Sequence, residues 1–323
     1  LQTHSRGKGI NLVFLGDGFD AENISNGDYL RVMNEQMERF FDIEPYHTYR
    51  DYFNVSTAIA VSPESGIGTV NTIRNTKFET TFTGEVGLRG NYSTIFNYAM
   101  EVSPVDESNL NQSLIIVTPN TIDYGGITEM WTDGSAIAFC PLSEDSYPYD
   151  ARGIIQHEAG GHGFGKLGDE YIYHNTFIDF CDCTCCEHVF EFNIAKSLGW
   201  YENLSLTGKM HEVPWSHLIF DDRYSDVVDI YEGGFMHARG VFRSEQNSCM
   251  NNNISYYNAI SREAIVKRIM EYAGESYSFE KFVENDKRDA VNSLSRSAER
   301  PGVTVRGNQY APRIHKGKPD ILK

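Results

Sequence analysis

The first half of the chain alternates short apolar runs with amphipathic segments, and this alternation constrains the fold more than any other feature. Ile10–Leu15 is a continuous apolar run that ends at Gly16-Asp17-Gly18, which is typical of a buried strand followed by a turn. Residues 28–41 carry apolar side chains at helical spacing, and Pro45 lies just beyond them. Further strands are expected at Tyr52–Val61, Leu114–Val117 and Ser135–Phe139. The pattern predicts an α/β fold with a mostly parallel sheet.

The pattern becomes less regular after residue 171. Helices are expected at about residues 189–198, 258–270 and 279–291. The last residues are polar and show little periodicity. We therefore expect an N-terminal α/β subdomain over residues 1–171, a C-terminal subdomain over 172–291 and an extended tail over 292–323, with the boundary near 171 inside one folded unit.

The charge of the chain narrows the classes of partner. Lys and Arg number 28 and Asp and Glu 45, so the formal charge is 28 − 45 = −17. An acidic surface repels phosphate, so neither a nucleic acid nor an anionic lipid surface is an expected partner. No run of 18 apolar residues occurs, so the sequence predicts no transmembrane segment.

Six cysteines are present, and four of them lie between Cys181 and Cys186. An even count with such a cluster favours an exported protein, whether secreted, periplasmic or on the cell surface. We expect the cluster to be structural, with disulfides preferred over a structural metal and with Cys140 or Cys249 as partners. The chain begins at Leu1 without a leader, so we expect a signal sequence or an upstream segment to precede it in the full protein.

One short segment carries the chemistry. Asp150 is a suitable N-cap for a helix that carries His157, Glu158 and His162. Two imidazoles and a carboxylate on one helix suit zinc, with the histidines as ligands and the glutamate as the base. Residues five apart differ by about 140° on an α-helix, so a regular helix would point the two imidazoles apart. Either a π-bulge at Glu158–Gly161 brings them together, or they are two unrelated histidines.

A third ligand is expected from the chain that turns back after the helix. Asp169 and Glu170 follow a glycine-rich stretch that allows such a turn. Far downstream, Ser248-Cys249-Met250-Asn251 resembles the Met-turn of metzincin peptidases, in which a methionine lies beneath the metal. His174 and His188 are further candidates, either as ligands or as ordinary histidines.

The segment HEAGGHGFGKLGDEY at 157–171 resembles the active-site segment of the IgA peptidase family of zinc metallopeptidases. The resemblance extends to Gly9–Phe19, Tyr124-Gly125-Gly126 and Asn247–Met250. It implies a metzincin-like fold, with a mixed and mostly parallel sheet flanked by helices and an irregular C-terminal subdomain. It also implies hydrolysis of peptide bonds. By position, the ligands would be His157, His162 and Asp169, the base Glu158 and the Met-turn residue Met250.

Several roles stay open at this point. Glu170 is an alternative third ligand, or it orients His157 or His162 without contacting the metal itself. Tyr256 or Tyr257 is a candidate donor to the tetrahedral oxyanion. Ser135–Phe139 is either an edge strand that pairs with substrate or a core strand. The function predicted is a zinc-dependent endopeptidase acting on protein or peptide substrates, and the alternatives are a non-catalytic peptidase-like binding protein and a zinc amidase.

Overall fold

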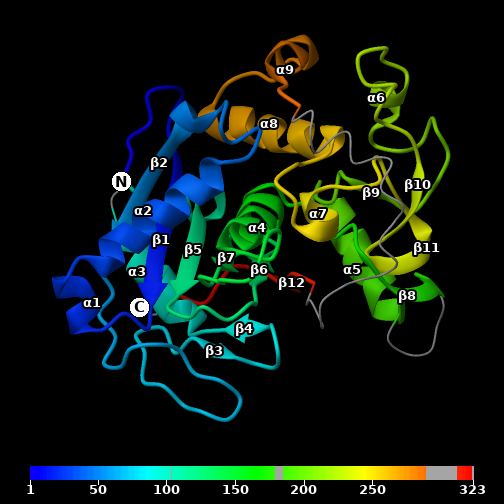
Figure 1. The fold of residues 1–323 in the computed structure, drawn as a ribbon. Helices are drawn as coiled ribbons and strands as arrows, with labels where there is room; N and C mark the ends of the chain where they lie inside the picture. Colours follow the sequence, from blue (N-terminus) through cyan, green and yellow to red (C-terminus); the bar gives the residue numbers. More distant parts are fainter. Residues whose placement is uncertain (103, 179–184, 289–310, 322–323) are drawn as a thin grey trace.

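The fold is built on a six-stranded sheet that helices cover on both faces (Figure 1). The computed structural model describes residues 1–102, 104–178, 185–288 and 311–321. Four neighbouring strands of the sheet run parallel, β6 is antiparallel to β7, and β12 is parallel to β6. In order across the sheet, the strands are β12 (Arg313–His315), β6 (Ile127–Trp131), β7 (Ala136–Phe139), β5 (Leu114–Pro119), β1 (Ile10–Asp17) and β2 (Phe53–Ala58). The expected mixed and mostly parallel sheet is confirmed.

Strand β1 shows why the sheet is central. All eight of its residues are buried, because helices cover both faces of a parallel sheet. Successive side chains point to opposite faces, so Leu12 and Phe14 join one core cluster while Val13 and Leu15 join the other. Asp17 ends the strand as a buried carboxylate that accepts bonds from Ser62, Thr76, Phe78 and Thr80. It thereby anchors the long loop before β3.

The helix over residues 28–41 forms as predicted, as α2 (Asp28–Phe41). Its inner face packs into the larger core cluster, whereas α3 (Tyr92–Met100) packs into the cluster on the other face of the sheet. The remaining helices are α1 (Ala21–Ser25), α4 (Ala151–Ile155), α5 (Cys185–Ser197), α6 (Ser216–Ile219), α7 (Cys249–Asn252), α8 (Ala259–Ala273) and α9 (Phe279–Asn285), with 3-10 turns η1 (Arg50–Tyr52) and η2 (Leu110–Gln112).

The region after residue 171 contains a second sheet. It consists of β10 (Tyr231–Gly234), β11 (Met236–Arg243), β8 (Ile172–Phe177) and β9 (Leu204–Ser205), and a small hairpin of β3 (Thr81–Phe82) and β4 (Leu88–Arg89) lies elsewhere. Phe14 and Ile265 belong to the same core cluster, although they lie on opposite sides of the expected boundary. The two halves therefore share one core.

Of the two roles left open for Ser135–Phe139, the structure supports the core strand, because β7 lies between β5 and β6. The tail expected over 292–323 falls partly outside the described residues, but within 311–321 it forms β12 on the outer side of β6. Arg313 and His315 contact the buried carboxylate of Glu129 at 3.1 and 2.7 Å, which ties this strand to the sheet.

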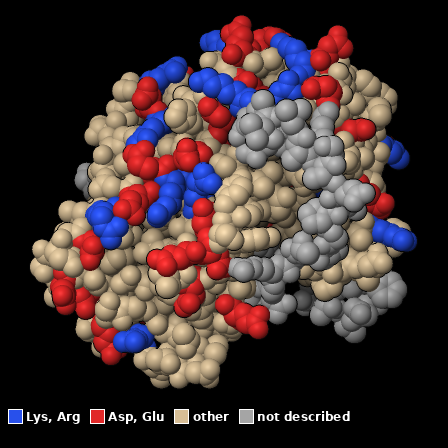
Figure 2. All heavy atoms as spheres, viewed as in Figure 1, with Lys and Arg blue, Asp and Glu red and all other residues tan. Residues whose placement is uncertain are grey.

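The chain carries more acidic than basic side chains. On the face shown in Figure 2, acidic side chains are spread over the described surface with basic ones among them. Among the described residues, no helix is long and apolar enough to cross a membrane.

Candidate metal centre

The histidine segment forms a π-helix. Asp150 caps α4 by accepting a hydrogen bond from Gly153 N at 2.9 Å, and the helix continues as the π-helix η3 (Gln156–Phe164). Its wider turn bonds residues five apart, as between Gly165 N and Gly160 O at 2.9 Å. His157 and His162 therefore share one face. The bulge expected within Glu158–Gly161 is found, and it extends over nine residues.

The glycines in this segment are required by close packing. A Cβ on Gly161 would overlap the sulfur of Met250, and a Cβ on Gly163 would lie 2.7 Å from Leu114 Cδ1. Such overlaps cost energy that a closely packed core cannot relieve. The glycine-rich sequence thus lets a widened helix lie directly against its neighbours.

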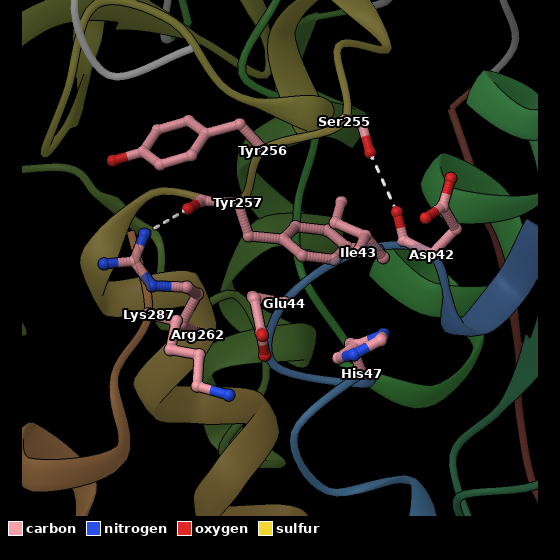
Figure 3. Close-up of a pocket in the computed structure, with 9 residues that line it drawn as sticks. All are labelled: Asp42, Ile43, Glu44, His47, Ser255, Tyr256, Tyr257, Arg262 and Lys287. Carbon is pink, nitrogen blue, oxygen red and sulfur yellow. Dashed lines mark hydrogen bonds between the residues drawn. The ribbon is translucent and has the colours of Figure 1, made fainter. Parts of the chain in front are cut away.

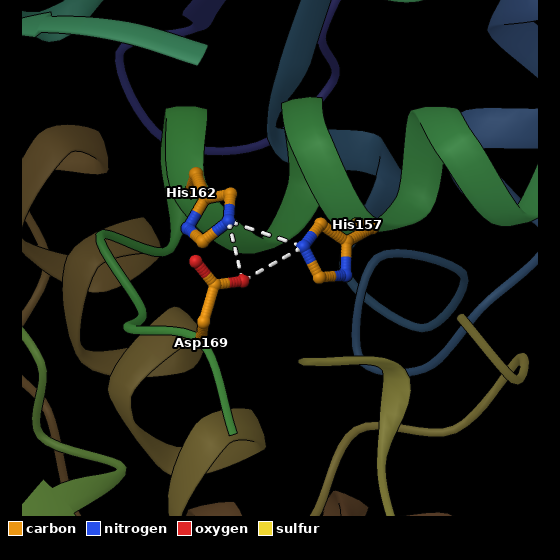
Figure 4. Close-up of side chains that lie close together, drawn as sticks. All are labelled: His157, His162 and Asp169. Atoms are coloured by element: carbon orange, nitrogen blue, oxygen red, sulfur yellow. Dashed lines mark hydrogen bonds and ion pairs between the residues drawn. The ribbon is translucent and has the colours of Figure 1, made fainter. Parts of the chain in front are cut away.

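His157, His162 and Asp169 converge in one buried cluster (Figure 4). The two Nε2 atoms lie 3.1 Å apart, and each lies 3.1 Å from Asp169 Oδ1. His157 Nδ1 lies 3.0 Å from Cys249 O, and His162 Nδ1 lies 2.8 Å from Leu167 O. A carbonyl only accepts, so each Nδ1 carries a proton and donates it. In the neutral imidazoles, each Nε2 then directs a lone pair into the cluster.

Three lone pairs that meet in a buried place repel one another unless a cation lies between them. Burial lowers the pKa of His157, but the hydrogen bond and charge of Asp169 raise it to about 9. The second oxygen of Asp169 is buried and has no hydrogen-bond partner. These features fit a metal cation, for which two imidazole nitrogens and a carboxylate oxygen are suitable ligands.

Asp169 reaches the cluster because the chain turns back sharply. Lys166 adopts a positive φ of 52°, and Gly168 exchanges two hydrogen bonds with the side chain of Asn203, at 2.9 and 2.8 Å. Phe235 N donates to the carbonyl of Asp169 at 2.8 Å. Both sides of the turn are therefore held, which fixes the position of the carboxylate.

Glu158 lies beside the cluster and outside it. Thr128 Oγ1, on strand β6, lies 2.8 Å from Glu158 Oε2 and 2.9 Å from the Glu158 carbonyl, so its one hydroxyl proton is donated to either of these oxygens. A Cβ on Gly126 would lie 3.2 Å from Glu158 Oε1, so the glycine provides the space that this carboxylate uses. Burial raises the pKa of Glu158. The arrangement suits a group that accepts a proton.

The Glu170 side chain is not part of the cluster of His157, His162 and Asp169. Its carboxylate accepts hydrogen bonds from Asn203 Nδ2 at 2.8 Å, Ser248 Oγ at 2.5 Å and Asn258 Nδ2 at 2.7 Å. Its oxygens are engaged by neutral donors, and the side chain joins three segments of the chain. The structure thus brings Asp169, and not Glu170, to the histidines.

The Ser248–Asn251 segment contacts His157 and the π-helix. Cys249 O accepts the bond from His157, and Glu170 N donates to Met250 O at 2.7 Å. Met250 is fully buried against Gly161. The residues that resemble a Met-turn therefore pack under the π-helix.

Tyr256 and Tyr257 do not reach the cluster. The Tyr256 hydroxyl donates to Glu245 at 2.8 Å, and the Tyr257 hydroxyl donates to the carbonyl of Gln156. Both residues line a separate pocket of about 180 Å³, together with Asp42, Ile43, Glu44, His47, Ser255, Arg262 and Lys287 (Figure 3). The expectation that one of them donates to an oxyanion is not supported, because each hydroxyl already has an acceptor elsewhere.

The pocket that contains the chemistry includes residues that the sequence did not single out. It is lined by Val86, Tyr124, Gly125, Gly126, Ile154, His157, Glu158, Tyr171 and Asn253. The Tyr171 ring lies nearly parallel to the His157 ring, with centroids 6.4 Å apart. Tyr171 is the last residue of the motif at 157–171, so the sequence could have pointed to it. Nothing in the sequence points to Thr128, because its contact with Glu158 joins residues that are far apart in the chain.

The prediction for the cysteines is tested at two positions. Cys140 and Cys249 are buried free thiols, so the expectation that one of them pairs with the Cys181–Cys186 cluster is wrong. Burial raises the pKa of both thiols, which suits a packing role. The disulfide or metal proposed for the Cys181–Cys186 cluster lies outside the described residues.

Comparison with known proteins gives one family. The sequence model described as IgA Peptidase M64 matches residues 1–196, which include His157, Glu158, His162 and Asp169. A comparison with curated proteins gives no match. Because the matched residues make up more than half of the 323-residue chain, this protein is a peptidase that belongs to the IgA peptidase M64 family.

Proposed function

We propose that the protein is a zinc-dependent endopeptidase in which Glu158 is the general base. The observation that carries this proposal is the buried convergence of two imidazole nitrogens and one carboxylate oxygen, each 3.1 Å from the others, beside a glutamate that is not part of the cluster. Zinc in catalytic sites takes three protein ligands of this kind and keeps one position for water.

The proposed ligands are His157, His162 and Asp169. Their atoms already lie at separations close to the roughly 3.3 Å that tetrahedral zinc with bonds of about 2.0–2.1 Å requires. When bound, zinc would activate water and polarise the scissile carbonyl as a Lewis acid. The bonds from the two Nδ1 atoms to backbone carbonyls hold both rings in the ligating tautomer.

Glu158 would move the proton. It accepts the proton of the attacking water and delivers it to the leaving amine, so its carboxylate must stay near the scissile bond without being a ligand. Thr128 holds Oε2, and Gly126, which lines the same pocket as Glu158, leaves room next to Oε1. Burial raises the pKa of Glu158, which makes its carboxylate a better proton acceptor.

The sheet and the Met250 contact support a metzincin-like arrangement. The antiparallel strand β6 lies beside the helix that carries the histidines, and Met250 packs beneath that helix. Extended polypeptide would enter the pocket beside Gly125 and Gly126, where the backbone lies close to Glu158. The count of six cysteines supports an exported location, which we propose together with the activity.

The oxyanion of the tetrahedral intermediate needs a hydrogen-bond donor, and we propose a tyrosine of this pocket for that role. Tyr124 and Tyr171 both line it. Loss of an oxyanion donor costs about 100- to 1,000-fold in kcat. We expect Tyr124→Phe or Tyr171→Phe to lose kcat with little change in KM, whereas Tyr256→Phe serves as the control. Wild-type kcat in both pocket variants would remove the tyrosines from the mechanism.

The proposal is tested with Glu158→Gln. This variant keeps the shape of the side chain and removes the base, so it should retain zinc and lose about 100- to 10,000-fold in turnover of a casein-type protein substrate. The wild type should lose activity with a chelator and regain it with zinc. Near-wild-type turnover in Glu158→Gln would refute the role of the base. Zinc binding without cleavage in the wild type would favour a binding protein, and cleavage of small amides alone would favour an amidase.

A further inference from the structure

A second group of histidines lies in the second sheet, apart from the first cluster. His174 is on β8, His188 is on α5 and His237 is on β11. His188 Nδ1 lies 2.9 Å from His237 Nε2, and their ring centroids are 5.2 Å apart. The His174 ring centroid lies 5.8 Å from that of His237. The three imidazoles therefore come from three separate elements, and the ribbons of β8, α5 and β11 lie close together in Figure 1.

The strand register explains two of these positions. His237 pairs with His174 across the parallel strands β11 and β8, so both side chains project from the same face of the sheet. The helix α5 adds His188 from above that face. The meeting of the three rings thus follows from the backbone arrangement.

We propose that His188 and His237, completed by His174, form a second zinc site. The pair of facing ring nitrogens resembles that in the first cluster, where the two Nε2 atoms are 3.1 Å apart. Thr176 Oγ1 lies 3.1 Å from His237 Nδ1, on the side of the ring away from His188. A hydrogen-bond partner on the outer nitrogen is how ligating histidines are usually oriented.

The third ligand needs a small movement. Among the described residues, only the first cluster has three ligand atoms already within 4.8 Å of one another. His174 is exposed, so its ring can turn toward the other two at little cost in packing. His237 is 1% exposed, so its ring is held in place on the face of the sheet that it shares with His174.

An all-imidazole set suits zinc, copper or nickel rather than magnesium or calcium. The role we infer is structural. Metal at this site would join α5 to β11. The residues at the start of β11 are hydrogen-bonded to the segment that carries Asp169: Phe235 N donates to the Asp169 carbonyl at 2.8 Å, and Met236 N donates to the Tyr171 carbonyl at 3.0 Å. The second site would thereby stabilise the segment that supplies the first site's carboxylate.

The test is a zinc titration of the chelator-treated full chain, with bound zinc counted per chain. We expect two equivalents for the wild type. His188→Gln and His174→Gln change partly or fully exposed residues and should weaken the second equivalent at least about tenfold. His211→Gln is the matched control, since His211 is exposed and stacks only on Phe220 among the ring contacts described. It should bind two equivalents.

The variant His157→Gln, His162→Gln separates this inference from the proposed function. It should lose the first equivalent and keep one that is sensitive to His188→Gln. A single equivalent in the wild type that disappears in this variant would overturn the second site. A second equivalent that is unaffected by His188→Gln and His174→Gln would also overturn it, because the zinc would then lie elsewhere.

Discussion

Replacing Glu170 with alanine separates a structural carboxylate from a ligand. Its side chain is fully buried and accepts from Asn203, Ser248 and Asn258, which belong to three different segments. Truncation leaves three buried donors without an acceptor, each costing about 1–3 kcal/mol. Part of this is offset, because burial of the carboxylate is itself unfavourable and raises its pKa. We expect a net loss of about 3–5 kcal/mol in the free energy of unfolding, as when one partner of a buried polar network is removed.

The assay is urea unfolding followed by fluorescence of the three tryptophans, with chelator present so that metal does not contribute. Zinc content is measured separately on folded protein at low temperature. Glu170→Ala should lose stability and keep most of its zinc, whereas Asp169→Ala should lose zinc. The reasoning fails if Glu170→Ala loses zinc while its metal-free stability stays at the wild-type value.

Three further predictions concern the packing, the thiols and the effect of pH. Gly161→Ala should cost about 1–3 kcal/mol through overlap with Met250, and Met250→Ala in the same chain should recover part of it; equal losses without coupling would contradict this. Thiol titration of the unfolded, unreduced protein should find two thiols, Cys140 and Cys249, whereas six would exclude disulfides among the other four. Burial raises the pKa of Glu245 to about 7, so the folded state retains a proton that the unfolded state loses near pH 4.5. Stability should therefore fall as pH rises from about 4.5 to 7, by up to about 1.4 kcal/mol per unit, and an unchanged slope in Glu245→Gln would refute this.

Local patterns were predicted well from the sequence. The helix over residues 28–41 has the expected bounds, because its apolar spacing is a property of neighbouring residues. The π-helix also followed from local information, namely a five-residue histidine spacing with glycines between. Both predictions rest on side chains that must share one face of one helix.

Non-local pairings could not be predicted from the sequence. The core and edge roles of Ser135–Phe139 stayed open, because nothing in this segment indicates that β6 will cover its outer side. Likewise, β12 pairs with a strand more than 180 residues earlier, and its contacts with Glu129 leave no periodic signal. Tyr256 was one candidate oxyanion donor because it follows Met250 closely in sequence, but its hydroxyl donates to Glu245.

The central claim is that His157, His162 and Asp169 bind zinc, and anomalous diffraction at the zinc edge from crystals grown with zinc tests it most directly. The account predicts a strong peak bonded to Nε2 of both histidines and to Oδ1 of Asp169, with Glu158 near the ion and not bound to it. A zinc-containing crystal without a peak at these three residues, or with a peak that Glu170 ligates in place of Asp169, would contradict the account.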